Sequence, residues 1–125
     1  MYKFLVALFL TIPIISFSQS NNFLQFESET IHLGKVRKGT KVNSEFAFTN
    51  ISDEDVVIEL VSTCECTEAE WPKFNIKPGA SGVIPFVFDT RQKEEEEEIS
   101  IDVMLKNVDQ DGNPVMIFLY YDYEY

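Results

Sequence analysis

The chain has 125 residues, and its 21 acidic and 10 basic side chains give it a formal net charge of −11. Such a surface repels phosphate backbones and anionic lipid headgroups, so the composition argues against binding to nucleic acid or to a membrane surface. Cationic partners are the ones that electrostatics permits. The length suits one domain with a modest single core.

Residues 1–18 have the pattern of a secretory signal peptide. A lysine lies among the first three residues, and the apolar run over 4–15 is shorter than the roughly 20 residues that span a bilayer. Small serine residues precede the expected cleavage point after Ser18. We therefore expect 19–125 to be an exported domain, periplasmic or secreted, with no membrane span. The alternative is an uncleaved membrane anchor, which Pro13 disfavours because it cuts the apolar run short.

Apolar and polar residues alternate with a period of two through most of the remaining chain, and no window of helical length shows an apolar stripe. Turn-forming clusters separate these short segments. The pattern predicts an all-β protein, a single immunoglobulin-like β-sandwich of about seven to eight strands. The residues that we expect in its core are Phe46, Phe48, Ile58, Leu60, Ile84, Phe86, Phe88, Ile101 and Val103.

Five segments allow more local predictions. The β-branched run 56–61 predicts a central strand, and 74–76 predicts another short strand. The sequence Lys-Pro-Gly-Ala at 77–80 is typical of a type II turn. Pro85 interrupts an alternating strand, which favours an edge position or a bulge because proline cannot donate to a ladder. The glutamates at 94–98 are interpreted as a solvated hairpin connection, with a cation site as the alternative.

The single histidine and the C-terminal tyrosines each have a structural and a functional interpretation. We interpret His32 as a structural or surface residue, because a metal site would need partners that the sequence does not place nearby. Over 121–125, three tyrosines alternate with two acidic residues. This pattern favours a last strand that packs its aromatic side on the sandwich, over a platform for carbohydrate or peptide.

The pair Cys64 and Cys66 could carry distinctive chemistry. In extended backbone the two Cα atoms would lie about 6.5 Å apart, at the upper end of the range of about 4.4–6.8 Å for disulfides, so pairing needs a local turn. A structural disulfide or thiol pair is one interpretation, and an exchange-active thiol pair is a second. Metal binding, above all of copper(I), is a third. Acidic neighbours such as Glu65 disfavour the thiolate that redox chemistry needs.

Several motifs, taken in order, resemble those of the exported bacterial family known as domain of unknown function 1573. The matching stretches are 32–36 (HLGKV), 46–50 (FAFTN), 64–67 (CECT), 71–72 (WP), 76–79 (IKPG) and 82–90 (GVIPFVFDT). The resemblance implies export and an immunoglobulin-like fold, similar to hydin-type and major sperm protein-like domains. The chain departs from the family pattern at Glu65, where the family usually has glycine, and at 94–98, where the family has a glycine-containing turn.

Two functional hypotheses follow. The sequence contains no GxSxG, no glycine-rich phosphate loop and no HExxH, so we expect no enzyme activity and no cofactor. The first hypothesis is a non-enzymatic binding or assembly module of the cell envelope, with envelope proteins or peptides as partners. The second is a thiol-redox or metal-handling protein that uses Cys64 and Cys66. For the first, Trp71 is the candidate binding anchor, although a core position is the alternative.

Overall fold

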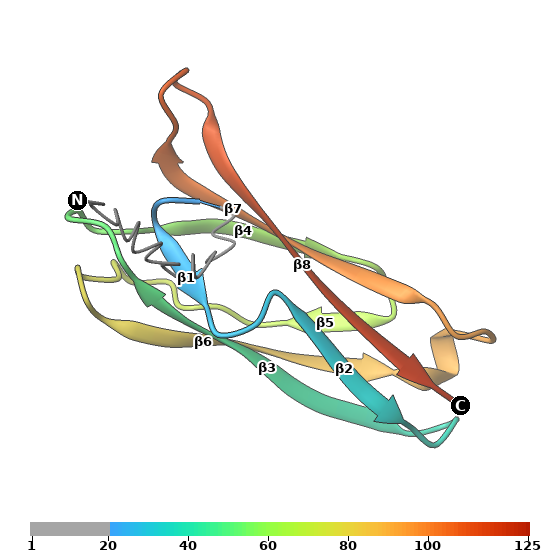
Figure 1. The fold of residues 1–125 in the computed structure, drawn as a ribbon. Helices are drawn as coiled ribbons and strands as arrows, with labels where there is room; N and C mark the ends of the chain where they lie inside the picture. The colour runs from blue at the N-terminus through green and yellow to red at the C-terminus, as the bar shows by residue number, and fades with distance from the viewer. Residues whose placement is uncertain (1–20) are drawn as a thin grey trace, which may run out of the picture.

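The computed structural model describes residues 21–125, so the signal peptide predicted at 1–18 lies outside the described residues. The described chain folds into two four-stranded sheets that pack face to face (Figure 1). One sheet has the strand order β1-β3-β6-β5 and the other β2-β8-β7-β4. The prediction of an all-β sandwich with about seven to eight strands is confirmed. The strands are β1 (Leu24–Phe26), β2 (Thr30–Lys35), β3 (Lys41–Asn50), β4 (Ile58–Thr63), β5 (Thr67–Ala69), β6 (Ser81–Asp89), β7 (Glu98–Val108) and β8 (Pro114–Glu124).

The core forms where the alternating faces of the strands meet between the sheets. Phe46 of β3 stacks on Phe86 of β6 with ring centroids 5.4 Å apart. Phe86 in turn stacks on Tyr121 of β8, which belongs to the opposite sheet, at 4.7 Å. Burying each large apolar side chain contributes on the order of 1.5–3 kcal/mol. Eight of the nine residues predicted for the core are buried, all except Leu60, because most of these strands keep a regular pleat.

The segment predicted as a central strand differs from expectation in two ways. β4 begins at Ile58 and forms an edge of its sheet. Between Ile58 and Leu60 the register against β7 shifts, so that Glu59 is an extra residue without a partner. A bulge of this kind reverses the side-chain alternation that follows it. The prediction of Leu60 as a core residue is wrong, because the bulge turns it outward and leaves it 48% exposed.

Pro85 lies in an internal strand, because β6 has β3 on one side and β5 on the other. The prediction of an edge strand or a bulge is therefore wrong. The absence of a proline N–H instead affects the pairing with β5, the neighbouring strand. The Glu70 backbone N–H donates to the Pro85 carbonyl at 2.9 Å, but Pro85 has no N–H to return to Glu70. β5 ends at Ala69, immediately before this incomplete pair.

Other local predictions had mixed outcomes. Residues 74–76 form no strand, and only Ile76 pairs, in an isolated bridge with Val56. The turn at 77–80 is confirmed, since Gly79 has φ of +79° and the Ala80 N–H donates to the Lys77 carbonyl. The acidic stretch 94–98 is exposed but is not a hairpin, because it leads from β6 in one sheet to β7 in the other.

Candidate functional site

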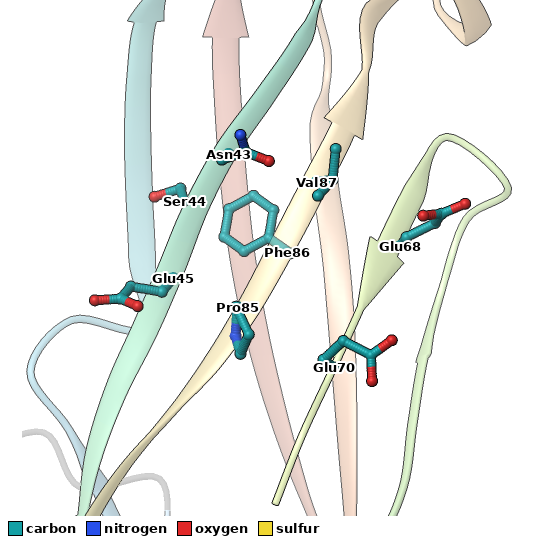
Figure 2. Close-up of a pocket in the computed structure, with 8 residues that line it drawn as sticks. All are labelled: Asn43, Ser44, Glu45, Glu68, Glu70, Pro85, Phe86 and Val87. Atoms are coloured by element: carbon teal, nitrogen blue, oxygen red, sulfur yellow. The ribbon is translucent and has the colours of Figure 1, made fainter.

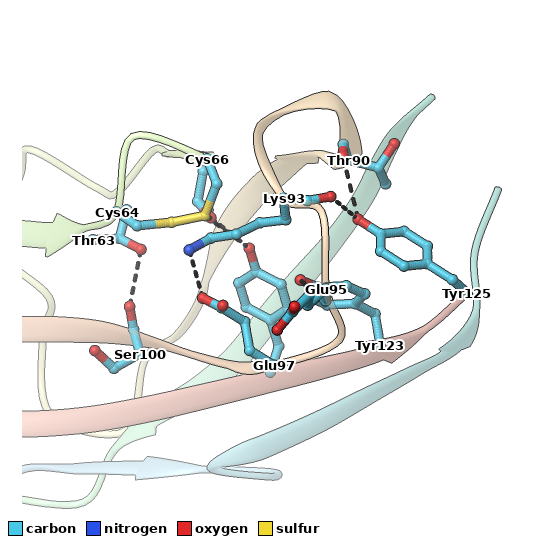
Figure 3. Close-up of polar contacts among 12 residues, drawn as sticks. Thr63, Cys64, Cys66, Thr90, Lys93, Glu95, Glu97, Ser100, Tyr123 and Tyr125 are labelled. Carbon is cyan, nitrogen blue, oxygen red and sulfur yellow. Dashed lines mark hydrogen bonds and ion pairs between the residues drawn. A yellow bond between two sulfur atoms is a disulfide. The ribbon is translucent and has the colours of Figure 1, made fainter. Parts of the chain in front are cut away.

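The two cysteines form a disulfide in the turn that leads into β5. Their Cα atoms lie 5.2 Å apart, closer than extended backbone would place them. The local turn that pairing requires is present, because the Thr67 N–H donates to the Cys64 carbonyl at 3.2 Å. Cys66 is buried and Cys64 is half-buried. Figure 3 shows the disulfide above the end of the sandwich that holds the C-terminal tyrosines.

A buried polar pair below the disulfide joins the two sheets. The hydroxyl groups of Thr67 in β5 and Tyr121 in β8 lie 2.5 Å apart, and the Cys66 sulfur lies 3.2 Å from the same Thr67 hydroxyl. Burial raises the pKa of Tyr121 from its usual value of 10 to about 12, although the hydrogen bond with Thr67 acts in the opposite direction. The Tyr121 hydroxyl therefore stays neutral near neutral pH. Its contact with Thr67 holds the start of β5 against the core.

The arrangement of possible metal ligands bears on the metal-handling hypothesis. Across residues 21–125, no group of three or more histidine, cysteine, aspartate or glutamate side chains is placed to hold a metal ion. His32 lies on the surface, where its side chain is 75% exposed and its Nδ1 is 2.8 Å from the Asp122 carboxylate. His32 is thus a surface residue on β2, with its Nδ1 engaged by Asp122.

Trp71 follows β5 at the free edge of its sheet. Its side chain is half-buried and packs against the hydrophobic core, while the Lys73 ammonium lies 3.1 Å from the centre of its ring. The indole therefore belongs neither wholly to the core nor wholly to the surface. A lysine over an indole face is a favourable cation–π contact that also shields the ring from solvent.

A groove on the outer face of the β1-β3-β6-β5 sheet lies beside this segment. It has a volume of about 480 Å³ and is formed by β3, β6 and the β5 region. We call it the outer-face groove (Figure 2). Sequence reasoning missed it, because its walls come from strands far apart in the chain. The residues that line it are Asn43, Ser44, Glu45, Glu68, Glu70, Pro85, Phe86 and Val87.

The charged residues of the outer-face groove are all acidic. Glu45, Glu68 and Glu70 line it, and no lysine or arginine does. Elsewhere in the described chain some acidic residues form ion pairs, as Asp55 does with Lys77 and Asp89 with Arg91. None of the six ion pairs found over residues 21–125 involves a glutamate of the groove. The groove therefore presents uncompensated negative charge.

The C-terminal tyrosines pack on the sandwich as the alternation predicts. Tyr121 and Tyr123 are buried, and Tyr125 is partly buried. The Tyr123 hydroxyl donates to the Glu95 carbonyl, and the Tyr125 hydroxyl donates to the Lys93 carbonyl, both at 2.6 Å (Figure 3). These hydrogen bonds hold the acidic segment between β6 and β7 against the end of β8. The tyrosines thus have a structural role that is visible in their contacts.

Comparison with known proteins identifies a family and a fold. The sequence model of a family described as "Protein of unknown function (DUF1573)" matches residues 24–117. No curated protein matches the chain. Among solved structures, a protein of unknown function from Porphyromonas gingivalis W83 superposes with a TM-score of 0.69 at 15% identity, over 82% of this chain and 46% of that one. The VesB protease of Vibrio cholerae superposes with a TM-score of 0.67 at 14% identity, over 83% of this chain and 32% of that one.

A third similar structure is close to this chain in length. The ASH/PapD-like domain 7 of human CEP192 superposes with a TM-score of 0.65 at 9% identity, over 88% of this chain and 89% of that domain. The chain spans only about a third of VesB and under half of the Porphyromonas protein. At these identities the likeness concerns the fold alone, and it confirms the predicted immunoglobulin-like class. Within residues 21–125, no helix is long and apolar enough to cross a membrane.

Proposed function

The chain belongs to the DUF1573 family, and on that premise we propose that it is a non-enzymatic binding or assembly module of the cell envelope, exported to the periplasm or secreted. Export is supported by the signal-peptide pattern of residues 1–18. The partners in this proposal are envelope proteins or peptides. The immunoglobulin-like fold supports it in general terms, since sandwiches present open strand edges to which other chains can add.

One observation carries the proposal, namely the surface around β5. This three-residue strand forms the free edge of its sheet. The disulfide lies at its start, the half-buried Trp71 follows its end, and Glu68 on the strand lines the outer-face groove. A partly exposed tryptophan beside a groove offers the large apolar contact that interface hot spots favour. The covalent bond before β5 limits the freedom of this edge, which lowers the entropic cost of binding.

Site-specific photo-crosslinking in the producing cell tests the proposal. A benzophenone amino acid replaces Glu68 in one variant and Phe118 in the control. Phe118 is 48% exposed on β8, in the other sheet. We expect irradiation to give a discrete adduct with an envelope protein from position 68, identified by mass spectrometry. The absence of an adduct at position 68, or the same adducts from both positions, would overturn the proposal.

A further inference from the structure

The outer-face groove has an apolar floor between two acidic walls. Pro85 and Val87 of β6 form the floor, as Figure 2 shows. Glu45 of β3 lies opposite Pro85 on one side, and Glu68 of β5 lies opposite Val87 on the other. Glu70, just past the end of β5, extends the second wall. Carboxylates therefore flank a strip of apolar surface on both sides.

The apolar strip continues along β6 beyond the groove. A second depression of about 340 Å³ follows on the same sheet face, and Ala47, Val83 and Glu27 are among its lining residues. Val83, Pro85 and Val87 share one face of β6, because successive side chains of a strand alternate. From residue 81 to residue 87 the strand runs about 20 Å, at roughly 3.3 Å per residue. This length fits an extended peptide of about six residues.

The charged side chains around the strip are all negative. Glu27, Glu45, Glu68 and Glu70 line the two depressions, and neither depression is lined by a basic residue. Among residues 21–125, the ion pairs involve none of these four side chains. Lys41 of β3 lies opposite Asp89 of β6, beyond the end of the groove, and Arg91 forms an ion pair with the same Asp89. A cationic ligand would thus meet unpaired carboxylates here.

We propose that the outer-face groove binds an extended segment of a partner protein that combines branched apolar residues with lysine or arginine. The apolar side chains share one face of the extended segment and pack on Pro85 and Val87, and the long cationic side chains reach sideways to the glutamates. This inference rests on the proposed function and names the partner chemistry and the surface. Opposite charges across such a contact raise the association rate and select the partner more than they raise affinity.

The test uses the purified protein and the capped hexapeptide Lys-Val-Arg-Val-Lys-Val, titrated by NMR and by calorimetry at low ionic strength. We expect saturable binding, with shifts in the amide resonances of β6 and β5. The triple variant E45Q/E68Q/E70Q should bind about tenfold more weakly, since three modest surface attractions are lost. Added salt should weaken binding to the unmodified protein, because exposed charges are screened.

A matched control removes the same amount of charge elsewhere. Asp53, Glu95 and Asp111 are exposed, and over the described chain none of their carboxylates takes part in an ion pair. The variant D53N/E95Q/D111N should keep the affinity of the unmodified protein. If both triple variants bind the peptide equally weakly, the effect depends only on the net charge of the protein, and the proposal is wrong. Circular dichroism and thermal melting establish that both variants are folded.

Two further peptides test the two halves of the recognition. Glutamate in place of the basic residues should abolish binding, and serine in place of valine should weaken it clearly. If either peptide binds as well as the original, or if the original does not bind, the proposal is wrong. These outcomes are separate from those of the crosslinking experiment. An adduct at position 68 without peptide binding would refute this inference and leave the proposed function intact.

Discussion

The hydroxyl groups of Tyr121 and Thr67 lie 2.5 Å apart and connect the two sheets beneath the Cys64–Cys66 disulfide. Thr67 begins β5, while Tyr121 belongs to β8 of the opposite sheet. Phe86 stacks on the Tyr121 ring from the groove side at 4.7 Å. One buried side chain thus contacts the disulfide turn, the edge strand and the strand that floors the groove. Stability and site geometry are coupled at this residue.

The first prediction concerns the loss of stability at alkaline pH. The folded protein raises the pKa of Tyr121 from 10 to about 12, so the neutral form is favoured in the folded state. This contribution is complete below pH 10 and is lost as the pH rises from 10 to 12. Between pH 10 and pH 12 the free energy of unfolding should therefore fall less in the Tyr121→Phe variant than in the unmodified protein. The expected difference is on the order of 1–2 kcal/mol. Urea denaturation at several pH values measures this difference, and parallel curves would contradict it.

The second prediction concerns the disulfide. Because Cys64 and Cys66 are paired in the turn before β5, replacing both with serine should lower stability by about 1–3 kcal/mol. Intact mass before and after alkylation should show no free thiol in the unmodified protein until it is reduced. We expect the double variant to retain its photo-crosslinked partner, since the cysteines support structure. Loss of a reductase or metal-transfer activity from a stable double variant would instead favour thiol or metal handling.

The third prediction concerns the close approach of Gly82 to Phe48. A Cβ atom added at Gly82 would lie 2.6 Å from the Phe48 Cζ, which forces the buried ring to move. Gly82→Ala should therefore destabilise the fold by about 1–3 kcal/mol, the usual cost of overpacking. Ser81→Ala, next to it and exposed, is the control and should change little. The double variant G82A/F48L should cost less than the sum of its parts, and strict additivity would argue against a clash.

The fourth prediction concerns Trp71. The indole is half-buried, so Trp71→Ala should cost about 1–2 kcal/mol, below the roughly 3–5 kcal/mol expected for a buried aromatic such as Phe86. Thermal melting of Trp71→Ala and Phe86→Ala compares the two. If Trp71 is an anchor, its variant should also lose the adduct formed from position 68. If the variant is folded and forms the adduct in the same yield, Trp71 is not part of the binding surface.

The fifth prediction concerns processing, which involves residues outside the described structure. The small residues before Gln19 lead us to expect that the exported protein begins at Gln19. N-terminal sequencing of the protein from the envelope or medium measures this. Recovery of Met1 on the exported protein would show that the segment is retained.

The sequence by itself determined the secondary-structure class, and eight of the nine residues that it predicts for the core are buried. Phe46 with Phe48, and Ile84 with Phe86, alternate strictly with outward residues, and all four are buried. This works because a regular strand places every second side chain on the same face, whatever its neighbours are. The turn around Gly79 was equally predictable, since its backbone conformation depends on local residue types.

Only the tertiary structure decided which strands are neighbours, and that in turn decided the site. Leu60 turns outward because the register shift that precedes it exists only against β7. Pro85 lies in an internal strand because β5, from earlier in the chain, pairs with the following residues of β6, and it is tolerated there because β5 ends beside it. The acidic walls of the groove come from Glu45 and Glu68, which lie far apart in sequence on either side of β6. Alternation assigns each residue to a face, but strand pairing depends on contacts between distant segments, so the groove has no signature in any single stretch of sequence.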